Sequence, residues 1–139
     1  MILSILIPTI PARKEMFFNL HTEIVRQAFE RGIELLHNAE DGTIGEKRNK
    51  LLNLASGEYV CFIDDDDTIS STYIDDILNA LVKKPDCVSL RGVITWDGSN
   101  PELFEHSIRY SAWVTNLTGQ IKYERPINHL NVVKASIAK

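Results

Sequence analysis

The stretch from Gly57 to Thr68, GEYVCFIDDDDT, constrains the fold of this chain more than any other. Its apolar run from Tyr59 to Ile63 is short, contains β-branched and aromatic residues, and follows a turn residue. This pattern is typical of a buried strand. In α/β sheets, ligands bind in the crevice beyond the carboxyl ends of such strands. We therefore expect the run of aspartates that follows Ile63 to lie at a ligand site.

This run consists of four adjacent carboxylates, Asp64, Asp65, Asp66 and Asp67. They repel one another, because each neighbouring negative charge makes ionisation less favourable. A divalent cation would relieve the repulsion, and oxygen ligands suit Mg²⁺, Mn²⁺ or Ca²⁺ rather than Zn²⁺. Acidic runs also occur as solvated loops or in the first turn of a helix, where carboxylates interact favourably with the helix dipole. The position directly after a buried strand favours a cation site.

The composition predicts a single globular domain, since the 139 residues are 44% hydrophobic and 24% charged. The net charge is −4 and there is no basic tract, so we expect no nucleic-acid partner. Cys61 and Cys87 have no ligand-spaced partner cysteine and are interpreted as buried thiols. No stretch reaches the ~20 apolar residues of a membrane span. Residues 1–7 lack the basic start of a signal peptide, so we predict a cytoplasmic location.

The first part of the chain alternates between strand and helix patterns. Strands are expected at residues 1–7, 33–37 and 59–63, and helices at 15–31, 45–55 and 71–83. This alternation implies right-handed crossovers and a mostly parallel sheet. The loops after the three strands then share one edge. We predict an α/β, Rossmann-like, three-layer α/β/α fold, with residues 1–85 as its nucleotide-binding half. The sequence contains no GxGxxG motif, so a dinucleotide cofactor is not indicated, and it contains no P-loop motif.

Residues 86–139 are less regular. Residues 87–96 are predicted to form one strand interrupted at Gly92, followed by a turn at residues 97–101. Short antiparallel strands are expected at 104–110, 112–116 and 120–124, and a helix from Asn131.

Four stretches together resemble glycosyltransferases of family 2, which have the GT-A fold. They are SILIPTIPAR from Ser4, TIGEKRNKLLNLASGEY from Thr43, VCFIDDDDTIS from Val60 and YERPINHLNVVKASIA from Tyr123. The second and third are specific together, whereas the first alone is a weak signal. The resemblance implies transfer of a sugar, with inversion, from a UDP- or GDP-linked donor to a saccharide or other hydroxyl acceptor. It also implies assistance by Mn²⁺ or Mg²⁺ and a role such as polysaccharide biosynthesis.

The resemblance also implies roles for individual residues. Pro8 and Thr9 would line the nucleobase pocket through backbone groups, with Arg13 nearby. Asp41, or Glu40, would hold the nucleoside, although this loop departs from the family's usual pair of acids. In the helix predicted at residues 45–55, Arg48 would face the nucleotide. In the aspartate run, Asp64 or Asp65 would approach the ribose. Asp66 would be the main metal ligand, and Asp67 would be its neighbour.

The resemblance implies that residues 86–139 are a partial acceptor-side half of the same domain, and we expect acceptor specificity to lie between Asp97 and Glu124. Three residues are candidates for the acceptor side of the site. His129 would line this side of the cleft by resemblance, although a histidine between apolar residues is commonly structural. Trp96 and Trp113 could stack on a sugar ring, and the alternative is that both belong to the core.

The catalytic base is not assigned. In the family it lies beyond the segment that resembles RPINHLN, and this sequence ends at Lys139. We expect a truncated chain, a natural fragment or a domain that retains only donor binding. A chain with open sheet edges is also expected to self-associate.

Two other functions compete with a glycosyltransferase. One is a non-catalytic module that binds a nucleotide sugar or a metal. The other is a phosphatase of the haloacid dehalogenase type, whose Asp-x-Asp-x-Thr motif matches Asp64, Asp66 and Thr68. That motif usually ends the first strand of its sheet, whereas here it would end the third.

Overall fold

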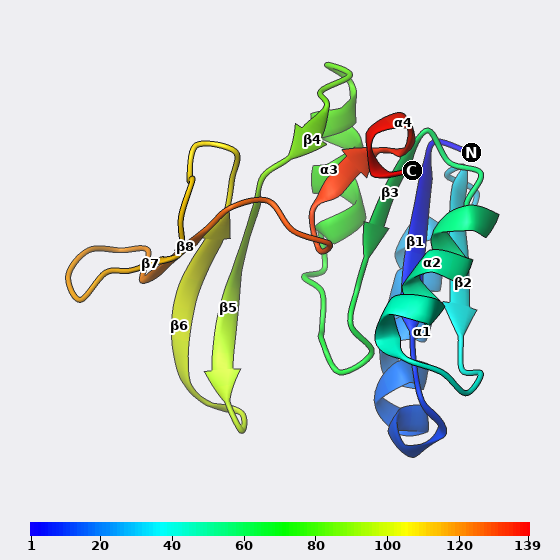
Figure 1. Ribbon diagram of the computed structural model, residues 1–139, viewed down its shortest axis with the longest axis horizontal. Helices are drawn as coiled ribbons and strands as arrows, with labels where there is room; N and C mark the ends of the chain where they lie inside the picture. The colour runs from blue at the N-terminus through cyan, green and yellow to red at the C-terminus, as the bar shows by residue number, and fades with distance from the viewer.

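The computed structural model describes all 139 residues and contains two β-sheets that lie side by side (Figure 1). The first sheet has five strands in the order β2-β1-β3-β9-β4. Their bounds are Ile33–Asn38 for β2, Leu3–Pro8 for β1, Tyr59–Phe62 for β3, Val132–Lys134 for β9 and Cys87–Val88 for β4.

Strand β1 lies between β2 and β3 and is parallel to both, with Leu3 opposite Ile33 on one side and Tyr59 on the other. Every residue of β1 is buried, as its largely apolar sequence predicts, and this includes the polar Ser4. The prediction of a parallel sheet is therefore correct for β2, β1 and β3. It does not extend to β9, which is antiparallel to both of its neighbours, β3 and β4.

Helices cover both faces of the first sheet and complete the three predicted layers. Helices α1 (Lys14–Ala28) and α3 (Tyr73–Leu81) pack on one face, where Leu20, Ile24 and Ile74 join the larger apolar core. Helix α2 (Ile44–Leu54) and the short α4 (Ala135–Ala138) cover the other face. The single-turn 3₁₀ helix η1 (Pro11–Arg13) connects β1 to α1. No helix combines the length and apolarity needed to cross a membrane.

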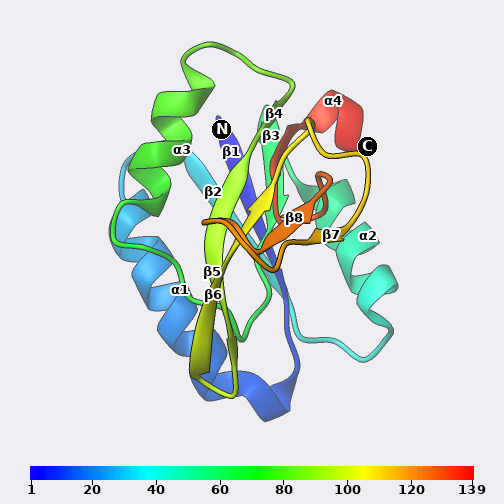
Figure 2. The ribbon, with the colours of Figure 1, turned by 90° about the vertical axis from the view of Figure 1, so that its left-hand side faces the viewer.

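The second sheet has four strands in the order β5-β6-β8-β7, and Figure 2 shows it in front of the first sheet. The strands are β5 (Leu90–Trp96), β6 (Ser99–His106), β7 (Val114–Thr115) and β8 (Tyr123–Arg125). The antiparallel pairing predicted for residues 112–116 and 120–124 is found in the β7–β8 pair. The strand predicted at residues 104–110 does not pair with β7: β6 is antiparallel to β5 and parallel to β8.

The prediction of one strand over residues 87–96 is also wrong. The chain leaves the first sheet after β4 and enters the second sheet at β5, so the break lies at Ser89. Gly92 lies within β5, where a Cβ atom would be 2.5 Å from the ring of Phe104. This glycine therefore permits close packing against an aromatic ring and does not interrupt the strand.

The turn after β5 consists of Asp97 and Gly98, whose φ angles are 50° and 79°. Two such residues form the type of tight turn that suits a hairpin, so β6 begins at Ser99, earlier than predicted. After β8 the chain returns to the first sheet, where β9 pairs with both β3 and β4. The helix predicted from Asn131 is thus a strand followed by the short α4.

Candidate functional site

The four aspartates form a tight turn directly after β3. The backbone N–H of Asp67 donates to the carbonyl oxygen of Asp64 at 3.0 Å. Because of this turn, neighbouring carboxylates have different surroundings. Asp65 is buried, Asp64 is half-buried, and Asp66 and Asp67 are exposed. The turn therefore separates carboxylates that hold the loops together from carboxylates that are free to bind a ligand.

Asp65 connects the turn to the loop after β1. One oxygen accepts a hydrogen bond from the Thr9 hydroxyl at 2.8 Å, and the other pairs with the Arg13 guanidinium at 2.9 Å. The ammonium of Lys47, which is only 5% exposed, donates to the backbone oxygen of Thr9 at 2.7 Å. Both oxygens of Asp65 thus have partners within the protein, and its evident role is to fix the two loops relative to each other.

Asp64 lies between Arg48 of α2 and His129 of the segment before β9. Its carboxylate oxygens are 3.3 Å from Arg48 Nη2 and 3.6 Å from His129 Nε2. The backbone oxygen of His129 accepts from the N–H of Phe62 at 3.0 Å, which holds this segment against the end of β3. Interaction with His129, and secondarily with Arg48, lowers the pKa of Asp64, although its partial burial acts in the opposite direction. Asp64 is therefore ionised at neutral pH.

Two buried nitrogen atoms beside Asp64 make no hydrogen bond: Arg48 Nε, and His129 Nε2, whose 3.6 Å separation from the Asp64 carboxylate is too long for one. A buried polar group without a partner loses about 1–3 kcal/mol relative to a paired one. Such groups are rare in folded proteins, and they indicate a site where a ligand or water supplies the partner. Oxygen atoms of an anionic ligand would satisfy both nitrogens when the imidazole carries its proton on Nε2.

Asp66 and Asp67 are the carboxylates left for a cation, because neither side chain has a hydrogen bond or an ion pair within the chain. Although Asp67 is exposed as a residue, partial desolvation of its carboxyl group and the charges of Asp64 and Asp66 raise its pKa to about 6. No group of three or more metal-ligating side chains converges here or elsewhere. Mg²⁺ commonly binds one or two carboxylates and completes its shell with substrate phosphates and water. Two free carboxylates fit a site of this kind.

The acids of the loop after β2 form no hydrogen bond or ion pair with the aspartate turn. Asp41 is exposed and has no hydrogen bond or ion pair, and the neighbouring Glu40 pairs with Lys50 at 2.7 Å on the surface. Pro8 is buried at the end of β1. Trp96 belongs to the second sheet, at the end of β5, and is 56% exposed.

Sequence reasoning missed Lys47, whose buried ammonium supports the loop after β1. The signal was available: Lys47 precedes Leu51 by one helical turn and so lies on the apolar face of α2. The start of this helix is fixed by Thr43 and Glu46, which form a reciprocal capping box. Arg48 and Lys47 are thereby held at the amino-terminal end of α2, beside the aspartate turn.

Comparison with known proteins gives the class of the protein. The sequence matches the family described as Glycosyl transferase family 2 over residues 21–134, which is most of the chain. The chain belongs to this family. No curated protein matches it significantly. Family membership argues against the haloacid dehalogenase interpretation of the aspartate run.

Solved structures of S. aureus TarS share the fold. TarS 1–349 superposes with a TM-score of 0.59 at 16% identity, over 99% of this chain and 48% of that one. The complex of TarS 1–349 with UDP-GlcNAc superposes with a TM-score of 0.58 at 17% identity, over 99% of this chain and 46% of that one. The complex with UDP has a TM-score of 0.56 at 18% identity, over 99% of this chain and 48% of that one. This chain spans about half the length of those structures. Its fold is the GT-A α/β fold predicted from the sequence.

Proposed function

We propose that the edge formed by the ends of β1, β2 and β3 binds a nucleoside diphosphate sugar, from which the sugar is transferred to an acceptor hydroxyl. The observation that carries this proposal is the pair of buried, unpartnered nitrogens of Arg48 and His129 beside a turn of four aspartates. Membership of the family supports it. So does the shared fold with TarS, whose structures include complexes with UDP-GlcNAc and UDP.

In this proposal, Asp66 and Asp67 hold Mn²⁺ or Mg²⁺. When bound, the ion would offset the negative charge that develops on the departing diphosphate. Arg48 donates a charge-assisted hydrogen bond to a phosphate oxygen, which orients the leaving group. Asp65 keeps the loops in position through Thr9 and Arg13. Pro8 and Thr9 contribute backbone groups to the nucleobase pocket.

A second candidate is a module that binds the donor without transferring the sugar. This candidate is favoured because the acidic side chains of the second sheet that are discussed below already have hydrogen-bond or ion-pair partners and are therefore poor candidates for a catalytic base. Glu102 pairs with Lys122 at 2.8 Å, and Glu124 accepts from the Asn116 side chain. Burial acts against ionisation of Glu105, yet hydrogen bonds from Tyr110, Arg91 and Arg109 hold its pKa at about 2. A carboxylate this acidic is a weak base at neutral pH.

The test of donor binding is calorimetric titration of UDP and of GDP, with and without Mn²⁺. We expect one nucleotide to bind in a metal-dependent manner, and Asp66→Ala to weaken binding at least about tenfold, or about 1.4 kcal/mol. Asp97→Ala is the matched control, because this exposed aspartate lies in the turn between β5 and β6. Binding of neither nucleotide, or equal binding by the wild type and Asp66→Ala, would contradict the proposal.

Turnover distinguishes the two candidates. A transferase releases the nucleoside diphosphate from a labelled donor when an acceptor is present, and a donor-binding module does not. The inverting stereochemistry is read from the anomeric configuration of the product. The cytoplasmic location and the self-association of the chain stay predictions.

A further inference from the structure

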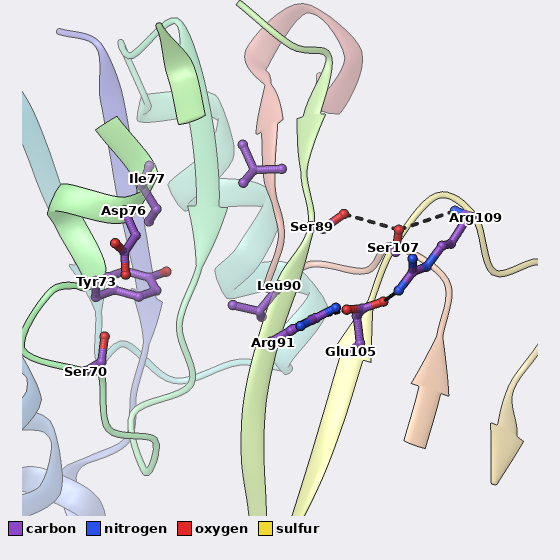
Figure 3. A pocket seen from close by; sticks show the side chains of 11 residues that line it. Ser70, Tyr73, Asp76, Ile77, Ser89, Leu90, Arg91, Glu105, Ser107 and Arg109 are labelled. Atoms are coloured by element: carbon purple, nitrogen blue, oxygen red, sulfur yellow. Dashed lines mark hydrogen bonds and ion pairs between the residues drawn. The ribbon is translucent and has the colours of Figure 1, made fainter. Parts of the chain in front are cut away.

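A cavity of about 520 Å³ lies between α3 and the second sheet, outside the aspartate turn (Figure 3). Its volume is within the range of pockets that hold small molecules, about 300–1,000 Å³. Ser70 lies at its edge and follows Asp67 by three residues. The segment that follows the aspartate turn therefore leads directly into the lining of the cavity.

The side of the cavity formed by α3 carries two large side chains with apolar surface, together with the carboxylate of Asp76. Figure 3 shows the side chains of Tyr73 and Ile77, from α3, across the cavity from the two arginines. Val88 and Leu90, from the ends of β4 and β5, add to the apolar lining. Such a surface suits the C–H groups on the face of a sugar ring, which pack against aromatic and aliphatic side chains.

The other wall is polar and held rigid. Glu105 is 3% exposed and accepts hydrogen bonds from the guanidinium groups of Arg91 and Arg109 and from the Tyr110 hydroxyl. The two arginine side chains are themselves 67% and 60% exposed. Each guanidinium has five N–H donors, so donors remain free after the contacts with Glu105. The buried carboxylate thus fixes the direction of two exposed, partly uncommitted donor groups.

The charges along the cavity are balanced, because Arg91 and Arg109 are matched by Glu105 and by Asp76 on α3. Neither a cation nor an anion is therefore favoured by net charge. The hydroxyls of Ser89 and Ser107, which are hydrogen-bonded to each other at 3.2 Å, can both donate and accept. A ligand that is uncharged, rich in hydroxyl groups and apolar on one face matches this lining.

From this geometry we infer that the cavity between α3 and the second sheet binds a neutral saccharide. The inference of a saccharide site rests only on the residues that line the cavity. Its use as the acceptor subsite rests on the proposed transferase function and on the position of Ser70 beside the aspartate turn. Arg91 and Arg109 then determine specificity through hydrogen bonds to the sugar hydroxyls, while Glu105 is a positioning residue that acts through them.

The test is chemical-shift mapping of the ¹⁵N-labelled chain with methyl glycosides of glucose, galactose and N-acetylglucosamine. We expect at least one glycoside to shift the backbone amides of Ser89 and Ser107 and the Nε–H signals of Arg91 and Arg109. Ser70→Trp places an indole at the edge of the cavity and should abolish these shifts. Ser71→Trp is the matched control, since this neighbouring serine is exposed and does not line the cavity. Arg91→Gln should weaken binding about tenfold.

Titration of UDP with Mn²⁺ into the same samples separates this inference from the proposed function. Saccharide shifts at the cavity, lost in Ser70→Trp while UDP binding persists, support both. Saccharide shifts without UDP binding support the site and overturn its role as an acceptor subsite. UDP binding without saccharide shifts at the cavity overturns the inference and leaves the donor proposal intact. Shifts caused only by glucuronic acid or sugar phosphates overturn the neutral class of ligand.

Discussion

The two sheets of this chain are stabilised by different kinds of contact. All buried hydrophobic residues lie in the first sheet, in the helices that cover it, or directly beside these elements. In the second sheet and its connections, from Leu90 to Arg125, the buried residues are Glu105, His106 and Ser107. The proposed donor site therefore rests on an apolar core, whereas the proposed saccharide site rests on ion pairs and hydrogen bonds.

The difference can be measured because the two sheets have separate spectroscopic signals. Both tryptophans, Trp96 and Trp113, belong to the second sheet or its connections. Trp113 is 75% exposed, and its ring lies 4.5 Å from the Arg125 guanidinium carbon. All but one short turn of the α-helices lies before residue 86 in the chain. Tryptophan fluorescence thus reports on the second sheet, and far-UV circular dichroism reports mainly on the first.

The largest expected effect tests the apolar core directly. Ile5 is fully buried at the centre of β1, so Ile5→Ala should lower the free energy of unfolding by about 2–5 kcal/mol. Leu103 of β6 is 37% exposed, and Leu103→Ala should lower it by about 1 kcal/mol or less. Urea unfolding followed by circular dichroism measures both. Equal losses in the two variants would remove the contrast between the sheets.

Two glycines test how easily each sheet adapts to an added methyl group. At Gly57 a Cβ atom would lie 2.6 Å from the backbone nitrogen of Ser4, which is fixed in β1. At Gly92 it would meet the ring of Phe104, which can rotate in a sheet without a buried apolar core. We expect Gly57→Ala to destabilise by about 1–3 kcal/mol and Gly92→Ala by less. Urea midpoints decide the order, and the reverse order would mean that the second sheet is tightly packed.

A smaller and localised effect is expected from the buried charge. Glu105→Gln removes the negative charge and replaces one of the two oxygens that accept from Arg91 and Arg109 with an NH₂ donor; both arginines stay largely solvated, so we expect a loss of about 1–2 kcal/mol. Amide hydrogen exchange should accelerate in β5, β6 and β8 but not in β1 or β3. Glu102→Gln, which breaks the half-exposed pair with Lys122, should change exchange little. Faster exchange throughout the chain in Glu105→Gln would show that the two sheets unfold together.

The smallest expected effect is a decrease in the stability of the second sheet at acidic pH. The pKa of Glu105 is about 2 in the folded chain, below the ~4.3 of a free glutamate. Its contribution to stability is therefore fully present above about pH 4.3 and is lost as the pH falls toward 2. Between these values, tryptophan fluorescence should change before far-UV circular dichroism does. The gap between the two signals should disappear in Glu105→Gln, and its persistence there would assign it to another group.

Most of the first sheet could be predicted because its signals are local. The three parallel strands lie within two residues of their predicted bounds, since each is an apolar run bounded by a turn residue or proline. The aspartate run could also be placed at the end of β3. The different roles of the four aspartates could not be predicted, because these roles depend on the turn from Asp64 to Asp67 and on partners that are distant in the sequence. Only the folded chain shows that Asp65 faces Thr9 and Arg13 while Asp66 faces solvent.

The second sheet was harder to predict because its pattern depends on contacts between distant residues. The apolar run of residues 87–96 has a uniform pattern, and nothing local marks Ser89 as the point where the chain changes sheets. The parallel pairing of β6 with β8 follows from the path of the whole connection between them. Glu105 is one acid among many in the sequence, and its burial between two arginines appears only when β5 and β6 are paired.

The placement of β9 between β3 and β4 has a consequence for the time course of folding. During synthesis, β3 is made long before β9, and its outer edge has no partner until residues 132–134 leave the ribosome. Val88 and Val132 must then meet across the whole second sheet, and closing so long a loop is slow. Insertion of β9 is thus expected to be the slowest step in completing the first sheet. Until it occurs, the nascent chain carries an open apolar edge that chaperones or like chains can bind.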